Sequence, residues 1–178
     1  MKLGLVFSGG GVRALAHAGL LKALEEKGLQ PSIISGTSGG ALIGALYACG
    51  VKPEDMVHFF KETPVFKWSM LTFKKVGLVD SAKYTKFFKK QFQCPTFEDL
   101  RLPLVVTATN LLNGKVQYFS KGELIQPLIA SSALPPYFSP VRIGDSLYCD
   151  GGLLNNFPTL LKAFRGVAFC YLKSVAKI

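Results

Sequence analysis

The sequence predicts an α/β fold in three layers, an α/β/α sandwich around a central sheet that is mixed and mainly parallel. Two observations carry this prediction. The first part of the chain twice repeats a short apolar strand, a glycine-rich turn and a helix, an order typical of parallel sheets. The second part contains two hairpins, which add antiparallel strands. At 178 residues the chain fits a single domain with a sizeable core.

The first repeat begins at the N-terminus. The apolar run Leu3–Phe7 stops at Ser8-Gly9-Gly10-Gly11, which indicates a buried strand that enters a glycine loop. From Val12 onward, apolar or small residues recur at helical spacing, and Gly28 follows as a candidate C-cap. This stretch is therefore strand, loop and helix.

The second repeat follows the same plan. Ser32–Ser35 is a candidate strand, Gly36–Gly40 a tight turn and Ala41–Cys49 a helix that ends at Gly50. Glycine inside a helix costs about 0.5–1 kcal/mol relative to alanine. The many small residues near the start of this helix therefore predict that it approaches a sheet closely.

The later elements are predicted by turn signals and periodicity. Asn113-Gly114 is a strong hairpin signal, and Gly144-Asp145 is a second, weaker one. The expected elements are a short helix over Pro53–Phe60, an irregular basic and aromatic region to Phe97, strands Leu104–Leu112 and Lys115–Ser120, a helix over Glu123–Ser132, strands Val141–Ile143 and Leu147–Cys149, and a last strand over Val167–Leu172.

Composition limits the classes of partner and compartment. Hydrophobic residues make up 49% of the chain and charged residues 18%, which excludes a disordered protein. The net charge of +10 predicts attraction to an anionic partner, although a solvated basic surface explains it equally well. No zinc-finger spacing or arginine-rich arm favours nucleic acid, so an anionic membrane surface is the better candidate.

The cysteines and the N-terminus suggest where the protein resides. The four cysteines are scattered without a CxxC pair, so we expect reduced thiols and neither disulfides nor a metal site. No stretch reaches the roughly 20 apolar residues of a membrane span, and the N-terminus enters a strand instead of a secretory leader. We expect a cytoplasmic protein, peripheral to membranes, that needs no cofactor.

The second glycine turn contains a candidate nucleophile. Gly36-Thr37-Ser38-Gly39-Gly40 matches G-x-S-x-G, in which a serine occupies a sharp turn between strand and helix and glycines let the backbone close. The helix N-terminus beneath such a serine favours developing negative charge. The alternative is a glycine-rich turn with a structural role only.

The first glycine loop is a candidate oxyanion hole. Gly9, Gly10 and Gly11 offer backbone N–H groups at the start of a helix, and Arg13 places a cation where the helix dipole disfavours one, which suggests a nearby anion. The stretch 9–14 also fits a dinucleotide-binding fingerprint. That interpretation fails because residues 31–36 supply no carboxylate to hold a ribose.

A serine nucleophile needs a base. The two histidines, His17 and His58, occur at unsuitable positions and are interpreted as structural or surface residues. Asp150 follows a predicted strand and precedes two glycines, so it is the preferred candidate. The other carboxylates considered are Asp145, in a hairpin turn, and Asp80 and Asp99, among helix-start signals.

Taken together, these motifs resemble one known family. Gly9-Gly10-Gly11-Val12-Arg13, Gly36-Thr37-Ser38-Gly39-Gly40 and Asp150-Gly151-Gly152 occur in the order found in the patatin-like phospholipases, and the stretch 130–135 is similar to a segment between their serine and aspartate. The resemblance implies a Ser38–Asp150 dyad without histidine, an oxyanion hole in the glycine loop, and hydrolysis of fatty-acyl esters in phospholipids or galactolipids through an acyl-enzyme.

The sequence departs from the family pattern in two places. Ala14 follows Arg13 where the family usually has glycine, and few residues follow Asp150 where relatives continue with further strands and helices. We expect residues 1–178 to form a single patatin-like domain, either a minimal version or one truncated at its C-terminus. A catalytically silent lipid-surface protein and an acyltransferase therefore stay open beside the hydrolase.

A basic and aromatic stretch, Lys61–Gln93, is a candidate interfacial lid. Eight lysines alternate there with seven aromatic residues, and each basic residue near an anionic bilayer contributes roughly 1 kcal/mol. In the alternative interpretation it is a helical segment that covers the core, with Phe87 and Phe88 packed inward.

Overall fold

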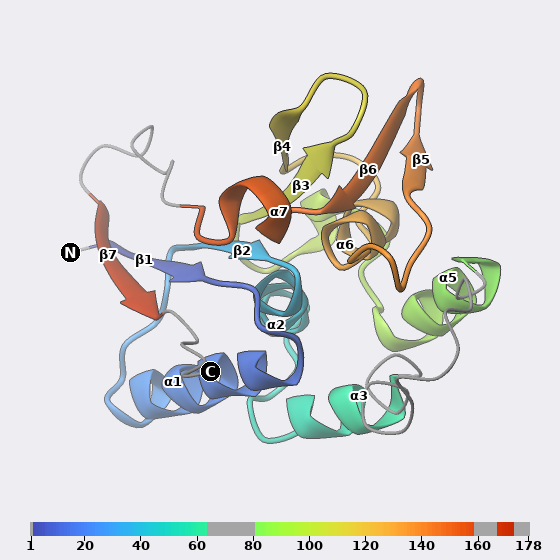
Figure 1. The fold of residues 1–178 in the computed structure, drawn as a ribbon. Helices are drawn as coiled ribbons and strands as arrows, with labels where there is room; N and C mark the ends of the chain where they lie inside the picture. The colour runs from blue at the N-terminus through green and yellow to red at the C-terminus, as the bar shows by residue number, and fades with distance from the viewer. Residues whose placement is uncertain (1, 64–80, 159–166, 173–178) are drawn as a thin grey trace.

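A computed structural model describes residues 2–63, 81–158 and 167–172, which contain one seven-stranded sheet and helices on both of its faces (Figure 1). The strands are β1 (Lys2–Phe7), β2 (Ile33–Thr37), β3 (Leu104–Asn110), β4 (Lys115–Phe119), β5 (Val141–Ile143), β6 (Ser146–Asp150) and β7 (Val167–Leu172). The helices are η1 (Gly11–Ala14), α1 (Leu15–Glu26), α2 (Gly39–Ala48), α3 (Met56–Glu62), α5 (Ser81–Gln91), η2 (Phe97–Asp99), α6 (Ile125–Ser131) and α7 (Gly152–Asn155).

The sheet is mixed. Strands β7, β1, β2 and β3 are parallel neighbours in that order. Strands β4 and β6 pair antiparallel with β3, and β5 pairs antiparallel with β6. The predicted strand over residues 167–172 is thus confirmed, and it lies at the edge of the sheet beside β1.

The first repeat forms as predicted, with one difference. The glycine loop leads into a single 3-10 turn, η1, before the regular helix α1 begins. Just past the end of that helix, Gly28 has a φ of +66°, and the Leu29 N–H donates to the Leu24 carbonyl at 2.9 Å. This is the glycine C-cap that the sequence predicts.

The two faces of β2 show how the layers are stacked. On one face Ile34 packs against α2 at Gly44, where an added Cβ would lie 2.9 Å from the Ile34 side chain. On the other face the hydroxyls of Ser35 and Thr37 donate to the carbonyls of Pro158 and Asn155. Helix α2 and the segment around α7 therefore cover opposite faces, and the predicted α/β fold is confirmed.

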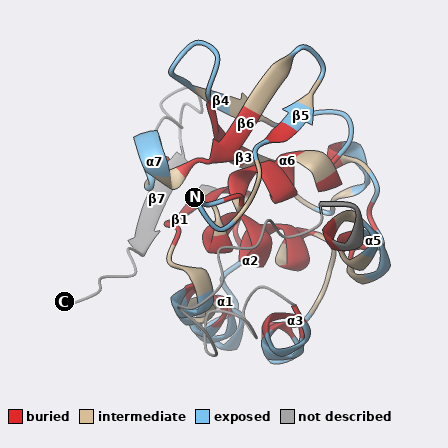
Figure 2. Cartoon of the chain, turned by 45° about the vertical axis from the view of Figure 1, so that its right-hand side comes forward, coloured by how far each residue is buried: buried red, intermediate tan, exposed pale blue. Residues whose placement is uncertain are grey.

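Helix α2 is almost completely buried, with Tyr47 alone half-exposed. An added Cβ at Gly40 would lie 2.5 Å from the carbonyl oxygens of Phe7 and Ser8. Only glycine allows so close an approach between the start of this helix and the end of β1. The predicted close contact between helix and sheet is confirmed (Figure 2).

The later elements agree with the prediction within a few residues at their ends, where helix boundaries are least sharply defined. Gly114 and Gly144 occupy the two hairpin turns, with φ of +65° and +57°. Helices α3 and α6 occupy the regions predicted to be helical.

Part of the basic and aromatic stretch is helical, whereas an irregular segment was expected up to Phe97. Residues Ser81–Gln91 form the regular helix α5 instead of an irregular segment. Tyr84, Phe88 and Phe92 are buried in the core, whereas Phe87 is half-buried, so this part covers the core. Residues 64–80, which include Asp80 and much of the candidate lid, lie outside the described residues. Within the described residues no helix is long and apolar enough to cross a membrane.

Candidate active site

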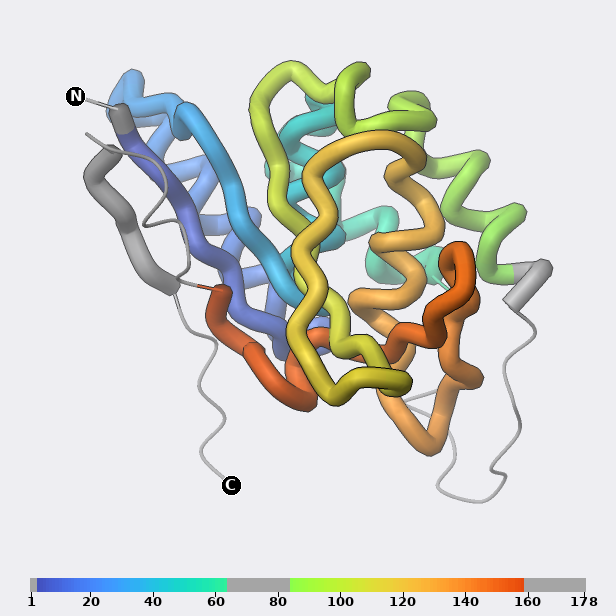
Figure 3. Tube along the Cα trace, turned by 90° about the horizontal axis from the view of Figure 1, so that it is seen from above, coloured from blue at the N-terminus to red at the C-terminus, as the bar shows by residue number. Residues whose placement is uncertain are grey.

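Strand pairing brings the predicted nucleophile and base together. Strand β4 pairs with residues 106–110 of β3, β2 pairs with residues 104–107, and β6 with residues 108–110. Because β4 overlaps both other partners, β2 and β6 must share the opposite edge of β3. They run toward each other there, and their carboxyl ends meet where Thr37 pairs with Thr107 and Asp150 with Ala108 (Figures 1 and 3).

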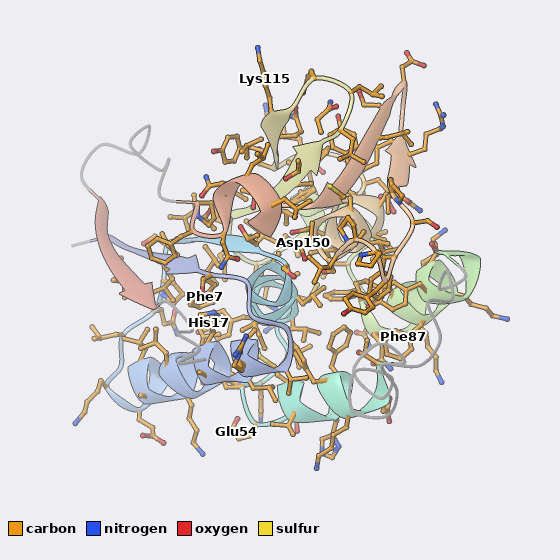
Figure 4. The ribbon with its side chains drawn as sticks, viewed as in Figure 1. Phe7, His17, Glu54, Phe87, Lys115 and Asp150 are labelled. Carbon is orange, nitrogen blue, oxygen red and sulfur yellow. The ribbon has the colours of Figure 1, made fainter. Side chains whose placement is uncertain are left out.

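The side chains at this junction are in direct contact. Ser38, the residue after β2, donates its hydroxyl to Oδ2 of Asp150, the last residue of β6, at 2.7 Å. The two residues are 112 positions apart in sequence. Figure 4 shows Asp150 at the centre of the molecule, between the strand ends and α2. The structure therefore joins the two residues expected to form a dyad.

Ser38 occupies a strained turn. Its φ of 52° and ψ of −126° make it the one non-glycine residue with positive φ among those described. At the adjoining Gly36 an added Cβ would lie 2.7 Å from the backbone of Ala41. The strained backbone holds the serine hydroxyl at the N-terminus of α2, as a nucleophile turn requires.

The last residue of α6 and the segment just after it hold the backbone of Ser38 and of Asp150. The Ser38 N–H donates to Oγ of the buried Ser131 at 2.8 Å. The Asp150 N–H donates to the carbonyl of Ala133 at 2.9 Å. Ser131 and Ala133, two positions apart in the chain, thus fix the separation between Ser38 and Asp150.

The Asp150 carboxylate is buried away from water and accepts two hydrogen bonds. Its side chain is 4% exposed. Oδ1 accepts the Gly152 N–H at 2.7 Å while Oδ2 faces Ser38. Burial raises the pKa of Asp150 above its ordinary value of 3.8, and the hydrogen bonds from Ser38 and Gly152 act in the opposite direction. A raised pKa makes this carboxylate a stronger base than an exposed one.

The glycine loop lies against the nucleophile. An added Cβ at Gly9 would lie 3.1 Å from Cβ of Ser38, and one at Gly39 would lie 2.7 Å from the carbonyl oxygen of Gly11. The Gly9 N–H donates to Oδ1 of Asn156 at 3.1 Å. Within the described part of the chain, the N–H groups of Gly10 and Gly11 have no acceptor.

Comparison with known proteins decides the family. The family described as patatin-like phospholipase matches residues 5–161 of the chain. The chain belongs to the patatin-like phospholipase family. Membership agrees with the predicted class of enzyme, a hydrolase of lipid carboxylic esters.

Relatives and solved structures extend the comparison. The patatin-like chain is 32% identical to lysophospholipase nte1 of Emericella nidulans over 86% of its length and 10% of the relative's. It is 30% identical to lysophospholipase NTE1 of Candida glabrata over 99% of its length, again 10% of the relative's. The chain thus spans about a tenth of these curated relatives.

Two solved structures share the patatin-like fold. VipD from Legionella pneumophila superposes with a TM-score of 0.68 and 18% identity, covering 96% of this chain and 49% of VipD. ExoU of Pseudomonas aeruginosa, in complex with SpcU, gives a TM-score of 0.51 and 19% identity over 76% of this chain and 38% of ExoU. At these identities the likeness concerns the fold alone.

The histidines of the patatin-like domain lie away from the dyad. His17 is buried, stacks on Phe7 at 4.6 Å, and donates from Nε2 to the Ser8 carbonyl at 2.9 Å (Figure 4). Burial lowers the pKa of His17, opposed by the hydrogen bond to Ser8. His58 is exposed on α3. Neither histidine bonds Ser38 in the described residues, so the candidate base in contact with Ser38 is Asp150.

The other charged residues considered for the site, Arg13, Asp145 and Asp99, form no contact with Ser38 or Asp150 among the described residues. Arg13 is exposed on η1 and forms no ion pair within the described residues. Asp145 lies in the β5–β6 turn, and Asp99 forms a capping box with Thr96 at the start of η2. These two aspartates have the structural roles expected of them.

Two site residues of the patatin-like domain were not singled out by the sequence. Ser131 supports the Ser38 backbone, and Asn156 joins the loop after Asp150 to the glycine loop through Gly9. The segment that contains Ser131 carried a family resemblance, but its contact could not be deduced from it. Asn156 had no distinguishing signal, because asparagine is common in turns.

Proposed function

We propose that the chain is a serine lipid-acyl hydrolase that uses Ser38 as nucleophile and Asp150 as its base. The observation that carries this proposal is the 2.7 Å hydrogen bond from the Ser38 hydroxyl to Asp150, at a strained strand–helix turn of a patatin-like fold. A carboxylate of ordinary pKa is a weak base for an alcohol. Desolvation of Asp150 reduces that mismatch.

The reaction proceeds in two stages. Asp150 accepts the Ser38 proton while Oγ attacks the ester carbonyl; the carbon–oxygen bond to the leaving alcohol then breaks and the alcohol takes the proton from Asp150. Water attacks the resulting acyl-enzyme with Asp150 again as base, which releases the fatty acid and restores Ser38. No step requires a metal or a cofactor.

The oxyanion that forms in each stage is assigned to the glycine loop, Gly9–Gly11, with Arg13 near its entrance. Among the described residues, the N–H groups of Gly10 and Gly11 are the open donors. The Gly9 N–H bonds Asn156 twice, through the side-chain Oδ1 at 3.1 Å and the backbone carbonyl at 3.4 Å, so it becomes available only if Asn156 as a whole moves away. One such donor is worth about 2.7–4 kcal/mol in comparable sites.

The substrate class follows from the family and from the names of the relatives. Curated relatives are lysophospholipases, and we assign to this chain the same class of substrate, a fatty-acyl ester of a phospholipid or related lipid. With a net charge of +10, transient contact with an anionic membrane is part of the proposal.

Product analysis tests the proposal. The chain is incubated with lysophosphatidylcholine, and free fatty acid and glycerophosphocholine are measured with and without an added alcohol. We expect free fatty acid from the unaltered chain and from Ser132→Ala, whose hydroxyl bonds its own helix at Leu128, and none from Ser38→Ala. Fatty-acid release by Ser38→Ala would refute the assignment, and transfer to the added alcohol in place of water would identify an acyltransferase.

A further inference from the structure

Large exposed apolar side chains are unevenly distributed over the molecule. Of the nine among the described residues, seven fall in four segments near the dyad. These seven, which we call the apolar rim, are Val12, Leu111, Leu112, Leu134, Tyr137, Leu153 and Leu154, and each is 42–63% exposed. The other two are Leu29 and Val57.

Three of the four segments adjoin active-site residues in the chain, and three lie on one side of the molecule. Val12 follows the glycine loop, Leu134 follows the residue that binds the Asp150 N–H, and α7 begins two residues after Asp150. Leu111 and Leu112 follow the end of β3. Figure 3 shows α7, the β3–β4 turn and the α6–β5 loop along one side of the molecule, at the carboxyl ends of the strands.

The segments that carry the rim contain no acidic residue. Residues 10–14, 111–114, 133–140 and 151–157 contain no aspartate or glutamate, and their single charged residue is Arg13. Two further cations, Lys115 and Arg142, lie just beyond these segments and are exposed. In Figure 4 Lys115 extends outward from the end of the β3–β4 hairpin. Asp145, an exposed carboxylate, lies in the β5–β6 turn, three residues after Arg142.

We infer that the apolar rim is the surface by which the chain docks onto an anionic lipid bilayer, with the dyad facing the membrane. The inference deepens the proposed function and rests on it, because a lipid-acyl hydrolase that acts on membrane phospholipids must reach them at the bilayer surface. Exposed leucine and tyrosine side chains at an interface enter the headgroup region, and adjacent cations bind anionic headgroups. An apolar cluster with a cationic border matches that partner in both respects.

The rim also differs from the surface that the sequence suggested. Within the described part of the lysine-rich stretch, Tyr84, Phe88 and Phe92 pack into the core and cannot enter a bilayer. In the described part of α5, the exposed lysines Lys86, Lys89 and Lys90 therefore have only the half-buried Phe87 as an apolar neighbour on the surface. Apolar and cationic side chains occur together only when the rim is taken with Arg13, Lys115 and Arg142, which lie on or just beyond its segments.

Vesicle binding tests the inference. All variants carry Ser38→Ala so that the vesicles stay intact, and binding is measured by sedimentation with vesicles of phosphatidylcholine, with and without phosphatidylglycerol. Leu111→Ser/Leu112→Ser is the main variant, and Leu153→Ser/Leu154→Ser is a second, distant in sequence. Leu29→Ser/Val57→Ser is the control, since it removes two exposed apolar side chains outside the rim, Leu29 at 49% and Val57 at 37% exposure.

We expect each rim variant to weaken binding to anionic vesicles about tenfold and the control to leave it unchanged, because each rim variant removes two apolar side chains from the bilayer. Added salt should weaken the binding of every protein. Equal binding by rim and control variants would overturn the inference. So would self-association that the rim variants abolish without any vesicle binding, since the rim would then be an interface between copies of the chain.

Fluorophosphonate labelling of the chain with Ser38 intact separates this inference from the proposed function. If the chain is labelled normally but its rim variants bind vesicles like the control, the proposed enzymatic function stands and the docking surface is refuted. If the chain is not labelled but its rim variants lose vesicle binding, the docking surface stands and the proposed enzymatic function is refuted.

Discussion

The hydroxyl oxygen of Ser131 accepts the backbone N–H of Ser38 at 2.8 Å, so a buried serine at the end of α6 supports the strained nucleophile turn. Two residues later the carbonyl of Ala133 accepts the N–H of Asp150. A single short segment therefore fixes the positions of both dyad residues. The contact gives Ser131 a positioning role that can be separated from substrate binding.

Ser131→Ala tests that role. Loss of the acceptor should let the Ser38 turn relax, lowering kcat roughly tenfold or more while KM changes little. Ser131→Thr keeps the hydroxyl and should restore part of kcat. Ser132→Ala is the control, because its hydroxyl bonds the Leu128 carbonyl within α6. Equal losses of kcat in the two alanine variants would show that Ser131 acts only through stability.

The pH dependence of activity reports the ionisation of Asp150. Burial raises its pKa above 3.8, and the base must be ionised to accept the Ser38 proton. The value of kcat/KM for a soluble ester should therefore rise with pH along a limb whose midpoint lies above 3.8. His58→Gln, a change at an exposed residue, should leave the limb unchanged. A midpoint at the ordinary value or below, or a limb that disappears in His58→Gln, would contradict the assignment.

His17 should make the fold sensitive to acid. Burial lowers its pKa below 6.5, so the folded state favours the neutral imidazole. The unfolded chain binds the proton first as pH falls, and the stability contributed by His17, present above 6.5, is lost below that value. His17→Gln retains a donor for Ser8 and does not titrate, so its free energy of unfolding should fall less between neutral and mildly acidic pH. Parallel urea-unfolding curves for the two proteins would rule this out.

A pair of glycine substitutions tests the contact between α2 and β1. Gly40→Ala would place a Cβ 2.5 Å from two backbone carbonyl oxygens, and we expect a loss of about 1–3 kcal/mol in the free energy of unfolding. Gly19→Ala lies in α1, where an added Cβ meets nothing within 4 Å, and should gain about 0.5–1 kcal/mol. Urea denaturation measures both. A neutral Gly40→Ala would mean that the helix can move away from the strand.

Local sequence signals predict much of the fold. The apolar run at the N-terminus, the glycine caps at Gly28 and Gly50, and the Asn113-Gly114 turn each depend on neighbouring residues, and each forms as predicted. Helix α5 agrees with the alternative interpretation of a helical segment that covers the core, and Tyr84, Phe88 and Phe92 recur every four residues, the spacing of one helical face. The lysines between them made the irregular, interfacial interpretation equally open.

The residue types of the candidate site could be predicted from local patterns, whereas the Ser38–Asp150 contact was expected only from the family resemblance and the contacts of Ser131 and Asn156 were not expected. Ser38 and Asp150 were recognisable because each follows a strand and adjoins glycines. Their meeting depends on two strands sharing one edge of β3, a long-range pairing that no local pattern encodes. The bond between Gly9 and Asn156 likewise arises only when distant loops converge.

The rate at which a fluorophosphonate labels Ser38 tests the central claim most directly. Asp150→Asn is a suitable variant because the raised pKa of Asp150 means that its charge destabilises the fold as pH rises through that pKa, so a neutral Asn should fold at least as well at neutral pH. We predict that mass spectrometry finds the adduct on Ser38 in the unaltered chain, no adduct in Ser38→Ala, and labelling at least a hundredfold slower in Asp150→Asn, on the order of 2.7 kcal/mol. Labelling of Asp150→Asn at the original rate, or an adduct on another residue, would contradict the account.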